Sequence, residues 1–172
     1  MKINGQQKSK ASIEKIWKVF AVEFDTAYKW MSGVSFSYGE KIGNQIEEAH
    51  TEGRICQLNA DGSGLKAVED LMEFDEENKV IRVRVKFDGT PFGFPLKENR
   101  VRMTLDKQDD ITLINYEFES DLKPLAKLVY PLIRLGFGMF IKRVFEDLAY
   151  YSENGVPHPR KQKELKAVAA TT

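Results

Sequence analysis

The chain has 172 residues, no formal net charge, 42% hydrophobic residues and 30% charged residues, which predicts one folded domain of ordinary size and excludes a disordered chain. A neutral chain argues against a long nucleic acid as partner, because such a partner needs a basic face. The single cysteine, Cys56, excludes an internal disulfide and fits a reducing compartment. The first residues contain no apolar stretch typical of a secretory signal, so we expect a cytoplasmic protein.

Residues 1–10 are expected to form a first edge strand. Ser12 then begins a short helix, because serine is a favoured N-cap. The apolar residues behind it recur at helical spacing and form one buried stripe: Ile13, Ile16, Trp17 and Phe20. A second helical turn is predicted over residues 25–30, with Asp25 as its cap.

The middle of the chain reads as strands and turns. Alternating apolar and polar residues predict strands over residues 34–39, 45–58, 65–74, 80–87, 98–106 and 111–120. Residues 59–64 form a strong turn signal, rich in asparagine, aspartate, serine and glycine. Since most connections are short, the strands should form an antiparallel meander with one face in water.

The segment Asp121–Gly155 is the only long stretch with strong helical character, so it should cover the other face of the sheet. Its apolar side contains Leu132, Leu135, Met139, Val144 and Leu148. Pro131 predicts a kink or the true start of the helix, and Gly155 predicts its end. We expect a domain over residues 1–157, followed by a polar, flexible tail over residues 158–172.

Several short strings of one known superfamily recur in order along the chain: Ala11–Trp17, Trp30, Gly53-Arg54, Asp61-Gly62, Glu69, Asp75 and Leu148–Pro157. Together with the order of elements, they resemble the START-like helix-grip superfamily, also called SRPBCC, and most of all its polyketide cyclase/dehydrase branch. The resemblance implies an α+β fold in which a curved antiparallel sheet of six to seven strands wraps around the C-terminal helix. It also implies a cavity for lipids, polyketides or other hydrophobic compounds, but no single reaction, because members include binders, transfer proteins and cyclases.

Arg54 and Glu69 are the most specific candidate pair. If Leu58 faces Leu65 across the turn, the register pairs Arg54 with Glu69 on the more apolar face of the sheet. The pair would then anchor a carbonyl, carboxylate or hydroxyl of a ligand in the cavity. In a catalytic interpretation Glu69 moves a proton and Arg54 polarises a carbonyl. A salt bridge that only fixes the register is the structural alternative, and a carboxylate held so close to arginine is a poor proton donor.

Further residues are predicted to line the cavity or its mouth. Alternation on the strands and the apolar side of the final helix select Cys56, Leu71, Val101, Met103, Tyr116, Phe118, Leu135 and Met139. Phe92 and Phe94 lie between turn-forming residues and are predicted to form a lid over the cavity mouth. For each of these residues, ordinary core or surface packing is the alternative.

Other kinds of site are not indicated. The chain has no histidine and cysteine spacing typical of a metal site, no glycine-rich phosphate loop and no nucleophile–base–acid motif, so we predict no metal and no cofactor. The segment Leu125–Ile141, with basic residues at 127, 134, 142 and 143, either touches a membrane surface transiently or packs on its own sheet. Its charges and Pro131 argue against a membrane-spanning helix.

The sequence therefore predicts a protein that binds or transports a small hydrophobic ligand, such as a lipid or a polyketide. The first alternative is a cyclase or dehydratase that acts on a polyketide-like substrate through Glu69 and Arg54. The second is a chaperone-like groove for a protein partner. The oligomeric state is left open.

Overall fold

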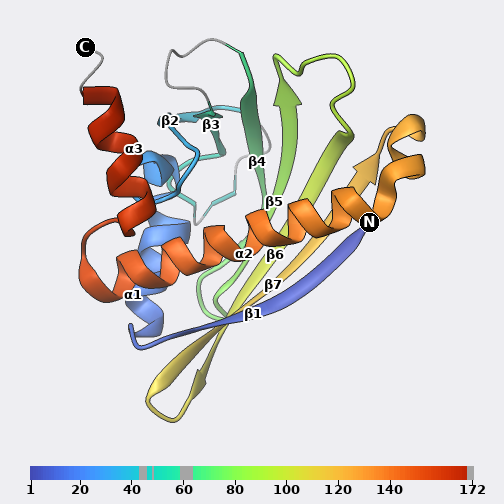
Figure 1. Cartoon of the computed structure of the whole chain (residues 1–172). Coiled ribbons are helices and arrows are strands. Elements are labelled where there is room, and N and C mark those ends of the chain that lie inside the picture. The colour runs from blue at the N-terminus through green and yellow to red at the C-terminus, as the bar shows by residue number, and fades with distance from the viewer. Residues whose placement is uncertain (43–45, 48, 59–63, 170–172) are drawn as a thin grey trace.

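The computed structural model describes residues 1–42, 46–47, 49–58 and 64–169. Most of the turn expected over residues 59–64 lies outside these residues, as does part of the strand expected from Gln45. Over the described residues the chain forms one sheet and three main helices (Figure 1).

The sheet is antiparallel and has seven strands in the order β1-β7-β6-β5-β4-β3-β2. The strands are β1 Lys2–Ser9, β2 Phe36–Glu40, β3 Gly53–Gln57, β4 Lys66–Asp75, β5 Val80–Asp88, β6 Leu96–Gln108 and β7 Ile111–Leu122. From β2 onward each strand pairs with the next one in the chain, and β1 pairs with β7 at the far edge. This arrangement confirms the predicted meander and the predicted edge position of the first strand.

The N-terminal helices are short and lie at one end of the sheet. Ser12 caps α1, Ile13–Trp17, by accepting a hydrogen bond from the backbone N–H of Lys15, as predicted. The chain continues as a π-helical turn, η1, Lys18–Val22, and a 3₁₀ helix, η2, Phe24–Lys29. The N-cap of η2 is Glu23 and not Asp25, because the carbonyl of Glu23 already accepts from the backbone N–H of Thr26 at 3.0 Å.

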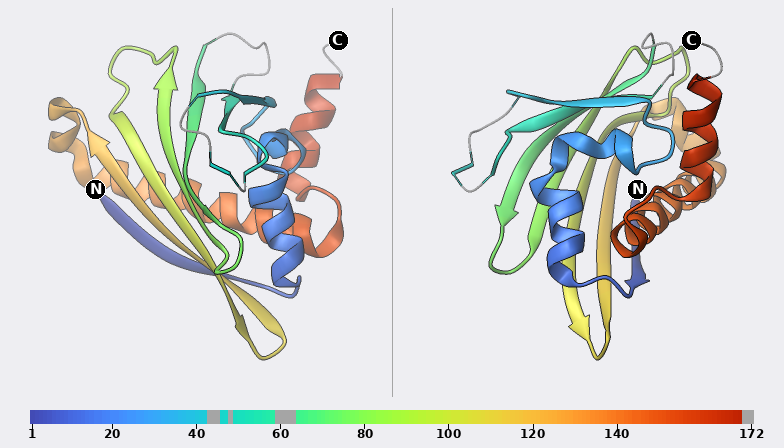
Figure 2. Two further views of the ribbon diagram at one scale, coloured as in Figure 1. Left: turned by 180° about the vertical axis from the view of Figure 1, so that it is seen from behind. Right: turned by 90° about the vertical axis from the view of Figure 1, so that its left-hand side faces the viewer.

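The long helix α2, Tyr130–Asn154, crosses the concave face of the curved sheet (Figures 1 and 2). A 3₁₀ helix, η3, Pro124–Val129, precedes it, so the α-helix begins beside Pro131, as one of the two predictions for this proline stated. It ends at Gly155, whose φ of 70° is the left-handed conformation that glycine adopts at helix ends. The buried residues of α2 all lie in its second half: Ile141, Val144, Phe145, Asp147, Leu148, Ala149 and Ser152.

Two strand predictions need correction. The long polar strand expected over residues 45–58 is a strand only from Gly53, because the Thr51 hydroxyl donates to the Gly53 carbonyl at 2.7 Å and turns the chain there. In β2 the inward residue is Ser37, while Phe36 is 48% exposed. The Ser37 hydroxyl donates to the Asp25 carbonyl and accepts from the backbone N–H of Tyr28. These bonds hold Ser37 on the buried face of β2, whereas the alternation of the sequence predicted that Phe36 and Tyr38 would be buried.

The expected flexible tail is wrong over most of its length, because residues Pro159–Ala169 form a third helix, α3. Arg160 of α3 donates to the buried carboxylate of Asp147 at 2.6 Å. Lys161 is 1% exposed, and its ammonium donates to the carbonyl of Val34 at 2.5 Å. The polar composition suggested solvation, but the partners of these charges are residues far away in sequence.

Asp147 joins α3 to the segment before β2, because it also accepts from the backbone N–H of Ser32 at 3.0 Å. We expect Asp147→Ala to lower the free energy of unfolding by about 3 kcal/mol, since it leaves buried hydrogen-bond donors without their acceptor. The neighbouring Glu146→Ala should cost less than about 1 kcal/mol, because this ion pair with Arg160 is partly exposed. Urea unfolding of both variants measures the difference, and equal losses would contradict the anchoring role of Asp147.

Candidate functional site

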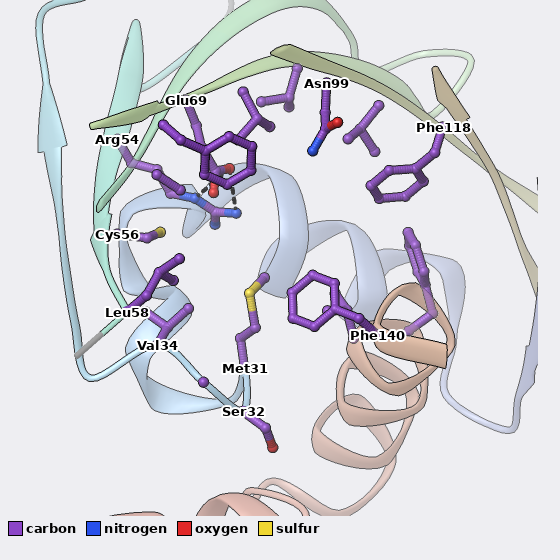
Figure 3. Close-up of a pocket in the computed structure, with 18 of the residues that line it drawn as sticks. Met31, Ser32, Val34, Arg54, Cys56, Leu58, Glu69, Asn99, Phe118 and Phe140 are labelled. Atoms are coloured by element: carbon purple, nitrogen blue, oxygen red, sulfur yellow. Dashed lines mark hydrogen bonds and ion pairs between the residues drawn. The ribbon is translucent and has the colours of Figure 1, made fainter. Parts of the chain in front are cut away.

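A cavity of about 280 Å³ lies between the concave face of the sheet and α2 (Figure 3). Strands β3 to β7, the segment Met31–Val34 and the helix α2 all contribute to its wall. Most of the lining is apolar, with valines from the central strands and, from α2, Phe137, Phe140, Val144 and Phe145. Phe140 is 47% exposed, so one side of the cavity is in contact with the molecular surface.

The polar end of the cavity is formed by Arg54 on β3 and Glu69 on β4, which are paired as the sequence predicted. Both side chains are buried, with 3% and 10% of their side-chain surface exposed. Oε2 of Glu69 accepts from Nε of Arg54 at 3.0 Å and lies 2.8 Å from its Nη2. Nη1 of Arg54 donates to the carbonyl of Phe24 at 2.6 Å, and the guanidinium lies 4.0 Å from the centre of the Phe24 ring. The arginine is therefore held on several sides.

Electrostatics at this end favour a charged pair next to a neutral thiol. Burial by itself lowers the pKa of Arg54, but Glu69, Cys56 and Asp25 together outweigh burial and raise it, so the guanidinium keeps its charge. Burial, helped by the negative charge of Glu69, raises the pKa of Cys56 far above its usual range. A thiol in this state is a poor nucleophile, so Cys56 is a lining residue and not a reactive group.

Asn99 on β6 is a second polar group of the cavity, and the sequence analysis did not identify it. Its side chain points from the sheet into the cavity (Figure 3). Among the residues that the structure describes, its buried Oδ1 has no hydrogen-bond partner. A buried amide without a partner is unfavourable unless another group satisfies it. The sequence could have indicated this position, since Asn99 is two residues before Val101 and four before Met103 and so lies on the same face of the strand.

The structure brings together five of the predicted residues at the cavity wall: Arg54, Glu69, Cys56, Val101 and Phe118. Three others, Leu71, Met103 and Tyr116, are buried in the hydrophobic core and do not line the cavity. Tyr116 is covered because its ring stacks on Phe145 with 4.1 Å between ring centres. These three residues face inward as predicted, but other side chains separate them from the cavity.

The remaining four predicted residues are not among those that line the cavity. Phe92 is fully exposed, while Phe94 packs against the lining residue Phe87 with ring centres 5.0 Å apart, so the lid stays a prediction. Leu135 and Met139 are 63% and 51% exposed. They occupy the outer side of α2, because the helix turns Phe137, Phe140 and Val144 toward the cavity in their place.

Groups of three or more histidine, cysteine, aspartate or glutamate side chains that could hold a metal ion do not occur among the described residues. Besides apolar contact, the described lining offers one buried ion pair, the amide of Asn99, the thiol of Cys56 and the polar residue Ser32.

No protein-family model and no curated protein matches the sequence. Solved structures do match the fold. A START superfamily protein from Mycobacterium smegmatis superposes with a TM-score of 0.54 at 14% identity, over 83% of this chain and 96% of that one. Ara h 8.0201 gives a TM-score of 0.61 at 16% identity, over 88% and 97%. DynU16, from the dynemicin biosynthetic locus, gives 0.64 at 13% identity, over 91% of this chain and 48% of that one.

These likenesses and the topology identify a START-like helix-grip fold, as the sequence predicted. At such low identity they establish the fold alone. The cyclase/dehydrase branch stays a prediction.

The buried pair is expected to behave as a structural unit. Arg54→Met should lower the free energy of unfolding by about 3–5 kcal/mol, because it leaves the Glu69 carboxylate buried without its partner. The double variant Arg54→Met/Glu69→Leu should recover most of this loss, since it removes both charges. Urea unfolding of the single and double variants measures the effect, and a double variant as unstable as the single one would refute it.

Cys56 provides a second test of the site. Because its thiol is buried and its pKa is raised, we expect a disulfide reagent at mildly alkaline pH to modify the folded protein far more slowly than the urea-unfolded chain. Absorbance of the released thiolate measures both rates. Equal rates would show that the cavity end is open to water.

Proposed function

We propose that this protein binds or carries a small hydrophobic ligand in the cavity between the sheet and α2. The observation that carries the proposal is an apolar cavity with a few buried polar groups at its wall, which is the usual composition of a small-molecule site. Apolar burial would supply the affinity, at roughly 25 cal/mol per Å² of surface removed from water. The polar groups would set the orientation of the ligand.

The size and the polar groups of the cavity suggest which ligands fit. Its volume of about 280 Å³ is close to the lower end of the roughly 300–1,000 Å³ found for ligand pockets. A ligand with one compact apolar body, such as a short acyl chain or a small polyketide, suits this volume. A hydroxyl group on the ligand would donate to Oδ1 of Asn99 and so satisfy a buried acceptor that has no partner within the described part of the chain.

The cyclase or dehydratase alternative has weaker support. Each nitrogen of Arg54 already faces a protein acceptor, either Glu69 or the carbonyl of Phe24, so the guanidinium is poorly placed to polarise a substrate carbonyl. One structural neighbour comes from a biosynthetic locus, which keeps the alternative worth testing. Once a substrate is known, unchanged turnover of Glu69→Gln would remove Glu69 as the acid or base.

A fluorescent apolar probe, N-phenyl-1-naphthylamine, tests the proposal in solution without vesicles. We expect saturable binding of one probe per chain, and competition by lipids identified through native mass spectrometry of the purified protein. Val85→Trp, which places a large ring at the cavity wall, should weaken probe binding more than about tenfold, since the ring occupies the volume that the probe needs.

Val156→Trp is the matched control, because Val156 is 48% exposed and lies outside the cavity lining. Circular dichroism shows that both variants are folded. The proposal fails if the wild-type protein takes up no probe, or if a folded Val85→Trp binds the probe as tightly as the control.

A further inference from the structure

The first half of α2 and the preceding η3 expose an unusual number of large apolar side chains. We call these residues the apolar ridge: Leu125, Leu128, Val129, Leu132, Leu135 and Met139. Their exposed fractions run from 49% to 83%. Single exposed apolar residues are normal on a protein surface, but a contiguous group of this size marks an interaction site.

The ridge lies outside the part of α2 that packs into the core. The sheet buries α2 only from Ile141 onward, and η3 projects at the end of the molecule opposite α3 (Figure 2). Pro124–Asn154 is apolar and long enough to cross a membrane by length and composition, yet only 6% of its most apolar window is buried. The ridge residues themselves are absent from the hydrophobic core of the described chain, whereas Phe137, on the inner side of this half, packs against it.

Charge identifies the partner of the ridge. From Leu122 to Phe145 the sequence has five basic residues and no acidic residue, although the whole chain has equal numbers of both. The basic residues are Lys123, Lys127, Arg134, Lys142 and Arg143. The preceding acidic residue, Asp121, is already paired with Arg100. Large apolar side chains with basic residues around them are typical of a helix that lies in the surface of an anionic bilayer.

We propose that the apolar ridge docks onto the surface of a membrane that contains anionic lipids. The helix lies in the interface and does not span the bilayer, because the part of α2 before its first buried residue, Tyr130–Phe140, is about 16 Å long at 1.5 Å per residue, short of the roughly 30 Å of a hydrocarbon core. A second copy of the chain is a poorer partner for this surface. A two-fold interface would bring the basic residues of both copies together and cost free energy through like-charge repulsion.

Phe140 connects this inference to the proposed function, on which this step rests, while the ridge itself lies on the outer side of α2. Phe140 lines the cavity and is 47% exposed, and its neighbour on α2 is Met139 of the ridge. Docking of the outer side of α2 would place Phe140, at the exposed edge of the cavity, near the lipid surface. A hydrophobic ligand would then pass between bilayer and cavity beside Phe140.

Flotation with lipid vesicles tests the docking. The full chain should float with vesicles of phosphatidylcholine and phosphatidylglycerol, and more weakly with phosphatidylcholine alone or at high salt. Leu128→Ser/Leu132→Ser should reduce binding more than about tenfold, because two leucines that would be buried in the bilayer on docking are lost. Lys127→Gln/Arg143→Gln should reduce binding to the anionic vesicles about fivefold for each removed charge.

The controls carry similar changes elsewhere on the surface. Met72→Ser on β4 and Leu165→Ser on α3 remove exposed apolar residues of 47% and 41% exposure, and both should float like the wild type. The inference is overturned if wild-type protein does not bind anionic vesicles, or if the ridge variants bind as well as these controls. It is also overturned if light scattering shows a dimer that dissociates in Leu128→Ser/Leu132→Ser, since a second copy would then cover the ridge.

The two proposals fail separately. Probe binding without vesicles measures the cavity alone, and Val85→Trp should still float, while Leu128→Ser/Leu132→Ser should still take up the probe. Loss of probe binding with intact flotation would refute only the ligand proposal, and the converse would refute only the docking.

Discussion

The contact on which the arrangement depends is the packing of Phe145 against the concave face of the sheet. Its ring stacks on Tyr116 at 4.1 Å and lies 6.2 Å from both Phe118 and Phe20. One residue of α2 thus joins the last strand and the first helical region in a single aromatic cluster. Aromatic groups of this kind contribute both large apolar burial and a preferred geometry, so they fix where the helix crosses the sheet. Phe145 also lines the cavity, together with Phe137 and Phe140 of the same helix.

The polar end of the cavity depends on the register between β3 and β4. Arg54 lies opposite Glu69 only because Cys56 lies opposite Ala67 and Gln57 opposite Lys66. A shift of β3 by one residue would turn Arg54 to the face of the sheet opposite Glu69. The buried pair therefore selects this register as well as contributing to the site, and its bond to the Phe24 carbonyl ties η2 to the same place. A pair so fully engaged suits a fixed wall better than a reacting group.

Much of the fold could be predicted because it follows from local patterns. Alternation located β4 to β7, Ser12 marked α1, and the hairpin register followed from Leu58 facing Leu65. What could not be predicted depends on contacts between distant residues. Composition alone assigned Lys161 to solvent, but it is buried against Val34. Helical spacing marked Leu135 and Met139 as apolar, yet it could not show that the sheet covers only the second half of α2. The wall of the cavity could be predicted only in part. Alternation along a strand shows which side of the sheet a residue faces, but it does not show which side chains surround that residue.

The two halves of α2 differ in the constraint that acts on them. Residues from Ile141 onward must be apolar on one side, since they fill the core, and their other side includes charges such as Asp147 that hold α3. Residues before Ile141 lie outside the core except on the inner side, where Phe137 packs against it. A soluble surface would favour polar side chains on the outer side. The sequence instead has apolar residues around most of the helix and only basic charges among them. A helix that is apolar all round is stable where something other than water surrounds it. The first half of α2 is thus exposed by the fold but apolar in composition. This mismatch is the physical reason to expect a lipid surface against it.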